Sequence, residues 1–193
     1  MPDLKYLITN LTSGNDEVAE KSVAQLVALG ESTLPAMFDL LDAADPDQRW
    51  WALRALAEIP HPEVPTRLRD ALHDPDTAVR QCAALGLSGQ PSAEAIPDLV
   101  VLLGDHDRLL ARLAGDALIS NGSEALSALV TTLESGSQPA KIEATRALAL
   151  IGDKNAIPAL FRAWQDGSTL VQHWAEIGFD RMGVGMQFFA PDG

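Results

Sequence analysis

Six helix-ending residues recur at nearly constant intervals along the chain and constrain its fold more than any other feature. Each is Gly or Pro, successive members lie 30, 31, 31, 30 and 31 residues apart, and they are Gly30, Pro60, Pro91, Gly122, Gly152 and Gly183. Small and aliphatic residues with helical spacing precede each of them, and a second stretch of this kind follows all but the last. A repeat of this length predicts stacked pairs of helices, because one pair cannot bury its apolar faces alone.

One segment, 139–167, shows the repeat unit in full as PAKIEATRALALIGDKNAIPALFRAWQDG. Gly152 ends its first helix, since glycine adopts the left-handed conformation that helix ends favour, and Pro158 suits the first turn of its second helix. The expected first helices are 18–29, 48–59, 79–90, 110–121, 140–151 and 171–182. The second helices are expected to begin near residues 32, 62, 93, 123 and 155, and residues 2–8 match a lone second helix.

Composition excludes several classes of function. The net charge is −13, which argues against nucleic acid as a partner and against an anionic membrane surface. Cys82 is the single cysteine, so an intrachain disulfide and a cysteine-rich metal site are both excluded. The N-terminal residues lack the basic start and apolar core of a signal peptide, so we expect a cytoplasmic protein.

Two segments identify a family. VRQCAALGLSG at 79–89 and EATRALALIGDKNAIPALFRA at 143–163 resemble HEAT repeats of the phycobilisome-lyase type, and the similarity extends over 2–183. This resemblance implies an all-α, right-handed α-solenoid of helical hairpins, with the first helices on its convex side and the second helices lining its concave side. We therefore expect 1–193 to form a single domain of about five full repeats with partial units at both ends.

A column of residues on the second helices is the main candidate for binding a partner protein. An ordinary solvated helix face would carry Glu, Lys and Gln, whereas these positions combine apolar, aromatic and charged residues. The candidates are Phe38, Asp39, Arg69, Val100, Val101, Val130, Phe161 and Arg162. Phe38, Phe161, Arg69 and Arg162 are the preferred contacts, because aromatic residues and Arg commonly anchor interfaces. The alternative is that curvature buries these residues against neighbouring helices.

Secondary candidates lie outside this column. Trp50 aligns with polar residues of other repeats, so it is either an exposed aromatic on the first helices or packs over a neighbouring helix. Phe188 and Phe189 near the C-terminus either fold back to seal the end of the stack or dock onto a second copy or a partner.

Polar motifs in the turns are interpreted as structural. In the turns Asp45-Pro46-Asp47, Asp74-Pro75-Asp76 and Asp105-His106-Asp107, the first Asp is expected to cap the next helix and the second to complement its dipole. A shared metal ion would need carboxylates closer than the roughly 10 Å between packed helices. Arg49, Arg80 and Lys141 recur at one helix position and predict a ladder of ion pairs with Asp residues of adjacent turns.

The resemblance implies two functions. The first is a non-enzymatic scaffold or assembly factor that grips a protein in a groove, with no catalytic residue, metal or cofactor. The second is a subunit or chaperone of a phycobilin lyase, with a bilin in the groove and arginines on its propionates. The chain has no His-Glu pair, which excludes the di-iron chemistry of the HEAT-like deoxyhypusine hydroxylases. Weak self-association through the C-terminal end is a third expectation.

Overall fold

Helices account for all regular structure in residues 3–184, the part of the chain that the computed structural model describes. The chain is divided into two compact units, Met1–Ala95 and Ile96–Gly193. The expected all-α class is confirmed. That residues 1–193 act as a single domain stays a prediction.

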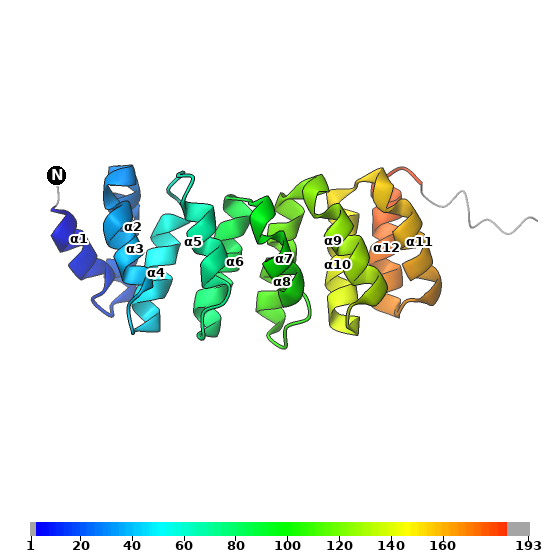
Figure 1. Cartoon of the computed structure of the whole chain (residues 1–193), viewed down its shortest axis with the longest axis horizontal. Helices are drawn as coiled ribbons and strands as arrows, with labels where there is room; N and C mark the ends of the chain where they lie inside the picture. The colour runs from blue at the N-terminus through cyan, green and yellow to red at the C-terminus, as the bar shows by residue number, and fades with distance from the viewer. Residues whose placement is uncertain (1–2, 185–193) are drawn as a thin grey trace, which may run out of the picture. The chain divides into compact units, whose positions relative to one another are not determined.

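Every expected helix is present, and Figure 1 shows the helices of each unit following one another in chain order. The expected first helices form the even-numbered set: α2 (Asp16–Leu29), α4 (Pro46–Leu56), α6 (Thr77–Gly89), α8 (Arg108–Ser120), α10 (Gln138–Ile151) and α12 (Thr169–Arg181). The second helices form the odd-numbered set: α1 (Leu4–Leu11), α3 (Leu34–Leu41), α5 (Val64–Ala71), α7 (Ile96–Leu102), α9 (Leu126–Ser135) and α11 (Ile157–Asp166). Four short 3-10 turns precede odd-numbered helices: η1 (Gly30–Thr33), η2 (Ala93–Ala95), η3 (Gly122–Ala125) and η4 (Lys154–Ala156).

Helix boundaries follow the residues that the repeat indicates. Asn15 and Ser137 cap α2 and α10 by accepting hydrogen bonds from backbone N–H groups of the first turn. Gly30, Gly122 and Gly152 have φ values of 61°, 59° and 70°, a backbone conformation that other residues rarely adopt. The local sequence therefore specifies where these helices begin and end.

Each odd-numbered helix packs on the even-numbered helix that follows it. This holds for α1 on α2, α3 on α4 and α5 on α6 in the first unit, and for α7 on α8, α9 on α10 and α11 on α12 in the second. The described residues thus form six complete pairs, three in each unit, with the turn of each pair between its two helices. The repeat predicted incomplete units at both ends of the chain, containing α1 and α12. In the structure both helices have a partner, because α1 packs on α2 and α12 packs on α11.

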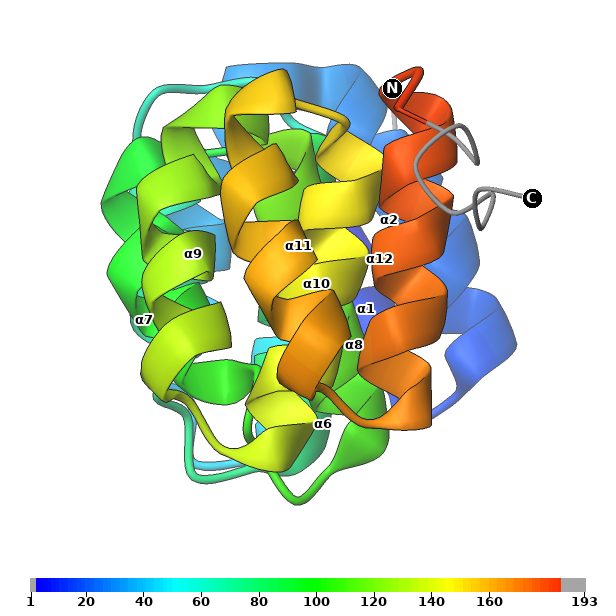
Figure 2. The same ribbon diagram turned by 90° about the vertical axis from the view of Figure 1, so that its right-hand side faces the viewer.

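Two layers run through each unit, an even layer of the even-numbered helices and an odd layer of the odd-numbered helices. In the second unit α10 packs against both α8 and α12, while α9 lies between α7 and α11. Figure 2 shows α9 beside α11, with α10 behind α11 and α12 on the side away from α9. Leucines fill the space between the layers and are fully buried, among them Leu26, Leu53, Leu118 and Leu148.

The even-numbered helices lie closer to one another than the odd-numbered helices do in both units. Small buried residues on the even layer, such as Ala55, Ala83, Ala147 and Gly178, allow this close approach. That the first helices lie on the convex side of the solenoid stays a prediction.

Gly178 offers a test of this close packing. A Cβ atom at Gly178 would lie 3.2 Å from the Cα of Ala149 on α10 and 3.1 Å from a methyl group of Leu160. We expect Gly178→Leu to lower the free energy of unfolding by about 2 kcal/mol, because it forces α12 away from α10. Urea unfolding followed by circular dichroism measures this change.

Gly89 provides the matched control, because a Cβ atom there would meet nothing within 4 Å. Gly89→Ala should leave the free energy of unfolding unchanged or raise it by up to about 1 kcal/mol, since Ala favours helix more than Gly does. Equal stability of Gly178→Leu and the wild type would contradict the close contact between α10 and α12.

Candidate binding surfaces

The predicted second-helix residues of the first unit lie on the odd layer and are already engaged within the protein. Phe38 on α3 is half-buried, with the guanidinium carbon of Arg67 4.7 Å from its ring centre. Arg69 on α5 forms ion pairs with Asp70 at 3.2 Å and with Glu94 at 3.5 Å. Asp39 is exposed on α3. That these residues bind a partner stays a prediction.

In the second unit, Val100 and Val101 on α7 help to line a hollow of about 520 Å³ between α7, α9 and the start of α10. Val101 is exposed, whereas Val100 and Val130 are half-buried. The remaining lining is mostly small or apolar and includes Ile96, Pro97, Ala128 and Thr131. The hollow thus adds an apolar recess to the odd layer of this unit.

Phe161 and Arg162 lie further along the odd layer, on α11. The ring centre of Phe161 lies 6.2 Å from that of Trp164 and 6.4 Å from that of Phe179 on α12, and Phe161 is 41% exposed. Arg162 donates to Glu134 of α9 at 2.7 Å, and both side chains are more than half exposed. That Phe161 and Arg162 bind a partner stays a prediction.

The even layer of the second unit carries a contact that the sequence did not indicate. The guanidinium carbon of Arg112 on α8 lies 6.0 Å from the ring centre of Trp174 on α12, although α10 packs between these two helices. We call this contact the Arg112–Trp174 bridge. The Arg112 side chain is 45% exposed, and His173 packs edge-on against Trp174 with ring centres 5.8 Å apart.

Beneath the bridge, α10 contributes a buried arginine. The Arg146 side chain is 1% exposed, and its Nε donates to Glu143 at 2.7 Å while its Nη1 donates to Asp116 of α8 at 2.7 Å. Its Nη2 donates to the carbonyl oxygen of Arg112 at 3.1 Å. A Cβ atom at Gly115 would lie 2.6 Å from this Nη2, so glycine at that position makes room for the guanidinium.

Exposed leucines adjoin both ends of the bridge. Leu109 precedes Arg112 by three residues and Leu170 precedes Trp174 by four, so each pair shares a helix face. Leu109 is 55% exposed and Leu170 is 54% exposed. The even layer of this unit thus combines an aromatic face, an accessible cation and apolar side chains.

The even layer of the first unit is also aromatic. Trp50 and Trp51 on α4 meet edge to face, with ring centres 4.8 Å apart, and both are half-buried. Beside them, Arg54 pairs with Glu20 of α2 at 2.8 Å and also with Glu58. The hydrogen bond with Glu58, with the charges of both carboxylates, raises the pKa of Arg54. Trp51 lies on the same helix as Trp50, so this contact does not decide between the two alternatives, and a binding role for Trp50 stays a prediction.

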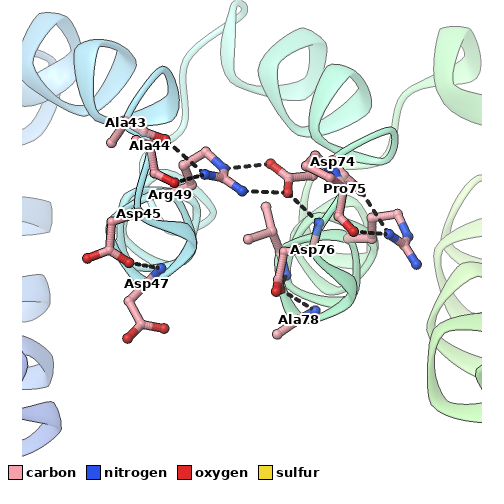
Figure 3. A network of polar contacts seen from close by, with 11 residues as sticks. Ala43, Ala44, Asp45, Asp47, Arg49, Asp74, Pro75, Asp76 and Ala78 are labelled. Atoms are coloured by element: carbon pink, nitrogen blue, oxygen red, sulfur yellow. Dashed lines mark hydrogen bonds and ion pairs between the residues drawn. The ribbon is translucent and has the colours of Figure 1, made fainter.

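The turn between α5 and α6 holds the strongest polar network of the first unit (Figure 3). Arg49 at the start of α4 donates from Nε and Nη2 to both carboxylate oxygens of Asp74, at 2.7 and 2.8 Å. Its Nη1 donates to the carbonyl oxygens of Ala43 and Ala44. The predicted pairing of an Arg with the Asp of an adjacent turn is therefore present at Arg49. Arg80 instead donates to the carbonyl oxygens of Asp74 and Pro75 in its own turn.

The capping roles within these turns differ from the expectation at two of the three sites. Asp45 caps α4 as expected. In the other two turns the second Asp is the cap, because Asp76 accepts from the N–H groups of Ala78 and Val79, and Asp107 accepts from that of Leu110. In these two turns the first Asp accepts a hydrogen bond from the N–H of the second, and Asp74 also accepts two hydrogen bonds from Arg49.

The described residues also bear on metal binding, thiol reactivity and membrane insertion. Within residues 3–184, no group of three or more His, Cys, Asp or Glu is arranged to hold a metal ion. Cys82 is buried, and the loss of hydration raises the pKa of its thiol to about 12. In the same part of the chain, no helix has the length and apolar character needed to cross a bilayer. Phe188 and Phe189 lie outside the described residues.

Comparison with protein families gives two matches. The model of HEAT repeats matches residues 4–88 and 65–139, and the model of the PBS lyase HEAT-like repeat matches residues 140–160. Together these matches cover most of the described helices.

Two curated relatives are similar over part of the chain. The phycobilisome maturation protein of Synechococcus elongatus is 36% identical over 121 residues, which are 61% of this chain and 58% of that protein. The phycocyanobilin lyase subunit beta of Pseudanabaena tenuis is 39% identical over 85 residues, which are 44% of this chain and 30% of that protein. The alignments thus span less than two thirds of either relative.

Solved structures with similar folds support the architecture alone. The complex of CpcE and CpcF of phycocyanin lyase from Nostoc sp. PCC7120 contains a chain that aligns with a TM-score of 0.61 and 22% identity, over 75% of this chain and 96% of that chain. A designed armadillo repeat protein in complex with the peptide (KR)4 aligns with a TM-score of 0.56 and 20% identity, over 94% of this chain and 100% of that chain. The helical-repeat solenoid predicted from the sequence is confirmed.

Proposed function

We propose, since this chain belongs to the HEAT-repeat proteins, that it is a non-enzymatic binding subunit that holds a phycobiliprotein during phycobilisome maturation. The observation that carries the proposal is the 36% identity over 121 residues with a phycobilisome maturation protein. Stacked helices supply a rigid, preformed surface, which lowers the ordering cost of binding a partner.

The even layer is the better supported binding face. Trp50 and Trp51 in the first unit and the Arg112–Trp174 bridge in the second supply aromatic residues and Arg, the usual anchors of interfaces. Phe38 and Phe161 on the odd layer remain the alternative anchors, although Arg67 and Trp164 partly cover their rings.

Binding to isolated phycocyanin tests the proposal. The chain is mixed at micromolar concentrations with bilin-bearing phycocyanin or with its bilin-free apoprotein, and sedimentation velocity measures complex formation. We expect a complex with at least one of these forms and none with ovalbumin, an acidic protein without bilin. Absence of a complex with both forms of phycocyanin would overturn the proposal.

Paired variants distinguish the two faces. If the even layer binds, Trp50→Glu with Trp174→Glu weakens the complex by more than about 30-fold, because the loss of each anchoring aromatic residue costs about 2 kcal/mol. Phe38→Glu with Phe161→Glu then has little effect. The reverse result would assign binding to the odd-layer residues that the sequence predicted. Circular dichroism checks that each variant keeps its fold.

A bilin lyase subunit is the second candidate function, and the 39% identity over 85 residues with phycocyanobilin lyase subunit beta favours it. Such a role would not use a covalent intermediate on Cys82, because the buried thiol has a pKa of about 12. The assay mixes the chain with apophycocyanin and free phycocyanobilin and follows coloured covalent adduct on a denaturing gel. Faster adduct formation with the chain present would favour the lyase role, and an unchanged rate would favour binding alone.

A further inference from the structure

The hollow between α7, α9 and the start of α10, which we call the α7–α9 hollow, has a lining suited to apolar side chains. The helices α7 and α9 lie side by side along it (Figure 2), and Val101 in its lining is 77% exposed. The hydroxyl groups of Thr131, Thr132 and Ser135 each donate to a backbone carbonyl oxygen four residues earlier on α9. Because these donors are already used, and the described residues that line the hollow include no charged side chain, the hollow favours an apolar occupant.

Hollows at the equivalent place in other repeats are smaller and carry charges. Their volumes are about 270 and 320 Å³, against about 520 Å³ for the α7–α9 hollow. Each contains the basic residue that lies four positions after a helix cap, Arg49 in the first hollow and Lys141 in the second. On α8 this position is Ala111, and α10 contributes Ala140 where the other two hollows have a valine. Two substitutions within the repeat thus make the α7–α9 hollow both larger and uncharged.

Carboxylates adjoin the α7–α9 hollow. The two charged residues of α7 and α9 are Asp98 and Glu134. Asp98 lies three residues before Val101 and Glu134 three residues after Thr131, so each shares a helix face with a residue that lines the hollow. Glu134 is paired with Arg162, but both side chains remain more than half exposed.

The charge of the second unit indicates what kind of partner fits. Asp and Glu outnumber Lys and Arg in this unit by 12 to 7. A second copy of the chain, or another acidic protein, would therefore be repelled. A partner that carries Lys or Arg beside its apolar side chains would be attracted, because its charges complement those near the hollow.

We propose that the α7–α9 hollow is a docking site for a basic amphipathic helix of a partner protein, with an apolar side chain in the hollow and Lys or Arg beside Asp98 and Glu134. Amphipathic helices bind apolar grooves through side chains spaced about one helical turn apart, which suits a hollow that lies along two neighbouring helices. This inference does not rest on the proposed function, which uses the aromatic residues of the even layer.

Binding of a fluorescently labelled, amphipathic helical peptide made only of Leu and Lys tests the site by fluorescence anisotropy at about 0.15 M salt. We expect saturable binding. A matched peptide with Ala in place of Leu should bind about tenfold more weakly or less, because it has no large apolar side chain to bury. A matched peptide with Glu in place of Lys should also bind at least about tenfold more weakly, because its charge no longer complements the chain.

Variants of the chain place the peptide in the hollow. Ala128→Phe fills the hollow and should weaken binding about tenfold. Ser127→Phe is the matched control, because it adds the same side chain to an exposed neighbouring residue of α9 that does not line the hollow. Asp98→Asn should weaken binding about threefold, whereas Asp180→Asn, which removes an exposed charge from α12, should have little effect. Circular dichroism checks that each variant keeps its fold.

Three results would overturn the inference: no binding of the Leu and Lys peptide, equal binding of the Lys and Glu peptides, or equal effects of Ala128→Phe and Ser127→Phe. Sedimentation velocity of the chain alone tests the other occupant. Self-association of the wild type that is lost in Ala128→Phe, without binding of the basic peptide, would assign the hollow to a second copy instead.

The phycocyanin experiment is independent of this outcome. A chain that binds phycocyanin but not the basic peptide overturns the docking site and leaves the proposed function intact. A chain that binds the peptide through the hollow but forms no complex with either form of phycocyanin does the reverse.

Discussion

Arg146→Met is expected to lower the free energy of unfolding by about 3 kcal/mol, because it removes one member of a buried charge network. The Arg146 side chain is 1% exposed and pairs with both Glu143 and Asp116. Methionine keeps much of the side-chain volume, so the substitution leaves no large cavity. The expected loss of stability comes instead from Glu143, which loses its hydrogen bond from Arg146, and from the missing hydrogen bond to the Arg112 carbonyl oxygen. Urea unfolding followed by circular dichroism measures the change.

The exposed pair Arg162–Glu134 is the control for this prediction. It has the same 2.7 Å separation, but its side chains are 60% and 54% exposed, so Arg162→Met should cost less than about 1 kcal/mol. Adding Glu143→Gln to Arg146→Met should recover part of the lost stability, because the buried charge left behind is removed. Equal costs for Arg146→Met and Arg162→Met would show that burial does not strengthen the network.

Asp74→Ala is expected to lower the free energy of unfolding by about 3 kcal/mol at neutral pH. Asp74 and Arg49 are only 10% and 12% exposed, and the substitution leaves Arg49 without its bidentate partner (Figure 3). It also removes the acceptor for the N–H of Asp76. Asp70→Ala, which breaks a more exposed pair with Arg69, should cost less than about 1 kcal/mol and serves as the control.

The cost of Asp74→Ala should depend on pH. Burial acts to raise the pKa of Asp74, but the hydrogen bonds from Arg49 and from the N–H of Asp76, with the charges of Arg49 and Arg80, outweigh it and hold this pKa below its ordinary value. A carboxylate with a lowered pKa stabilises the fold above its unfolded-state pKa of about 3.9, and that contribution is lost as pH falls through the folded-state pKa. The stability difference between wild type and Asp74→Ala should therefore narrow below about pH 4. A difference that stays constant down to about pH 2 would contradict the ionic origin of the effect.

The sequence by itself determined the helices and their boundaries. Apolar spacing defines each helix, and residues such as Asn15, Gly30 and Gly152 end or cap helices through contacts within a few residues of themselves. The repeat length of 30 or 31 residues also determined that the helices stack in pairs. These properties are local, so one sequence suffices to predict them.

Capping of the aspartate turns shows where local reasoning was insufficient. Asp45-Pro46-Asp47 and Asp74-Pro75-Asp76 have the same pattern, but they stand at different positions relative to the helices that follow them. The caps Asp45, Asp76 and Asp107 are spaced 31 residues apart, so Asp74 lies two residues before its cap, where Ala43 stands in the preceding turn. Asp74 accepts two hydrogen bonds from Arg49, which lies 25 residues earlier in the chain. The short motif alone did not show which Asp stands directly before the first helical residue.

Only the tertiary structure decided how closely the even-numbered helices approach one another and which of their side chains meet. The packing distance between even-numbered helices depends on small residues such as Gly178 meeting Ala149 on another helix, and this contact has no signature within either helix alone. The Arg112–Trp174 bridge joins two helices on either side of α10, so neither residue stood out in the alignment of the repeats. The repeat specifies each pair of helices, but the candidate binding face arises from contacts between pairs, where residues distant in the sequence come together.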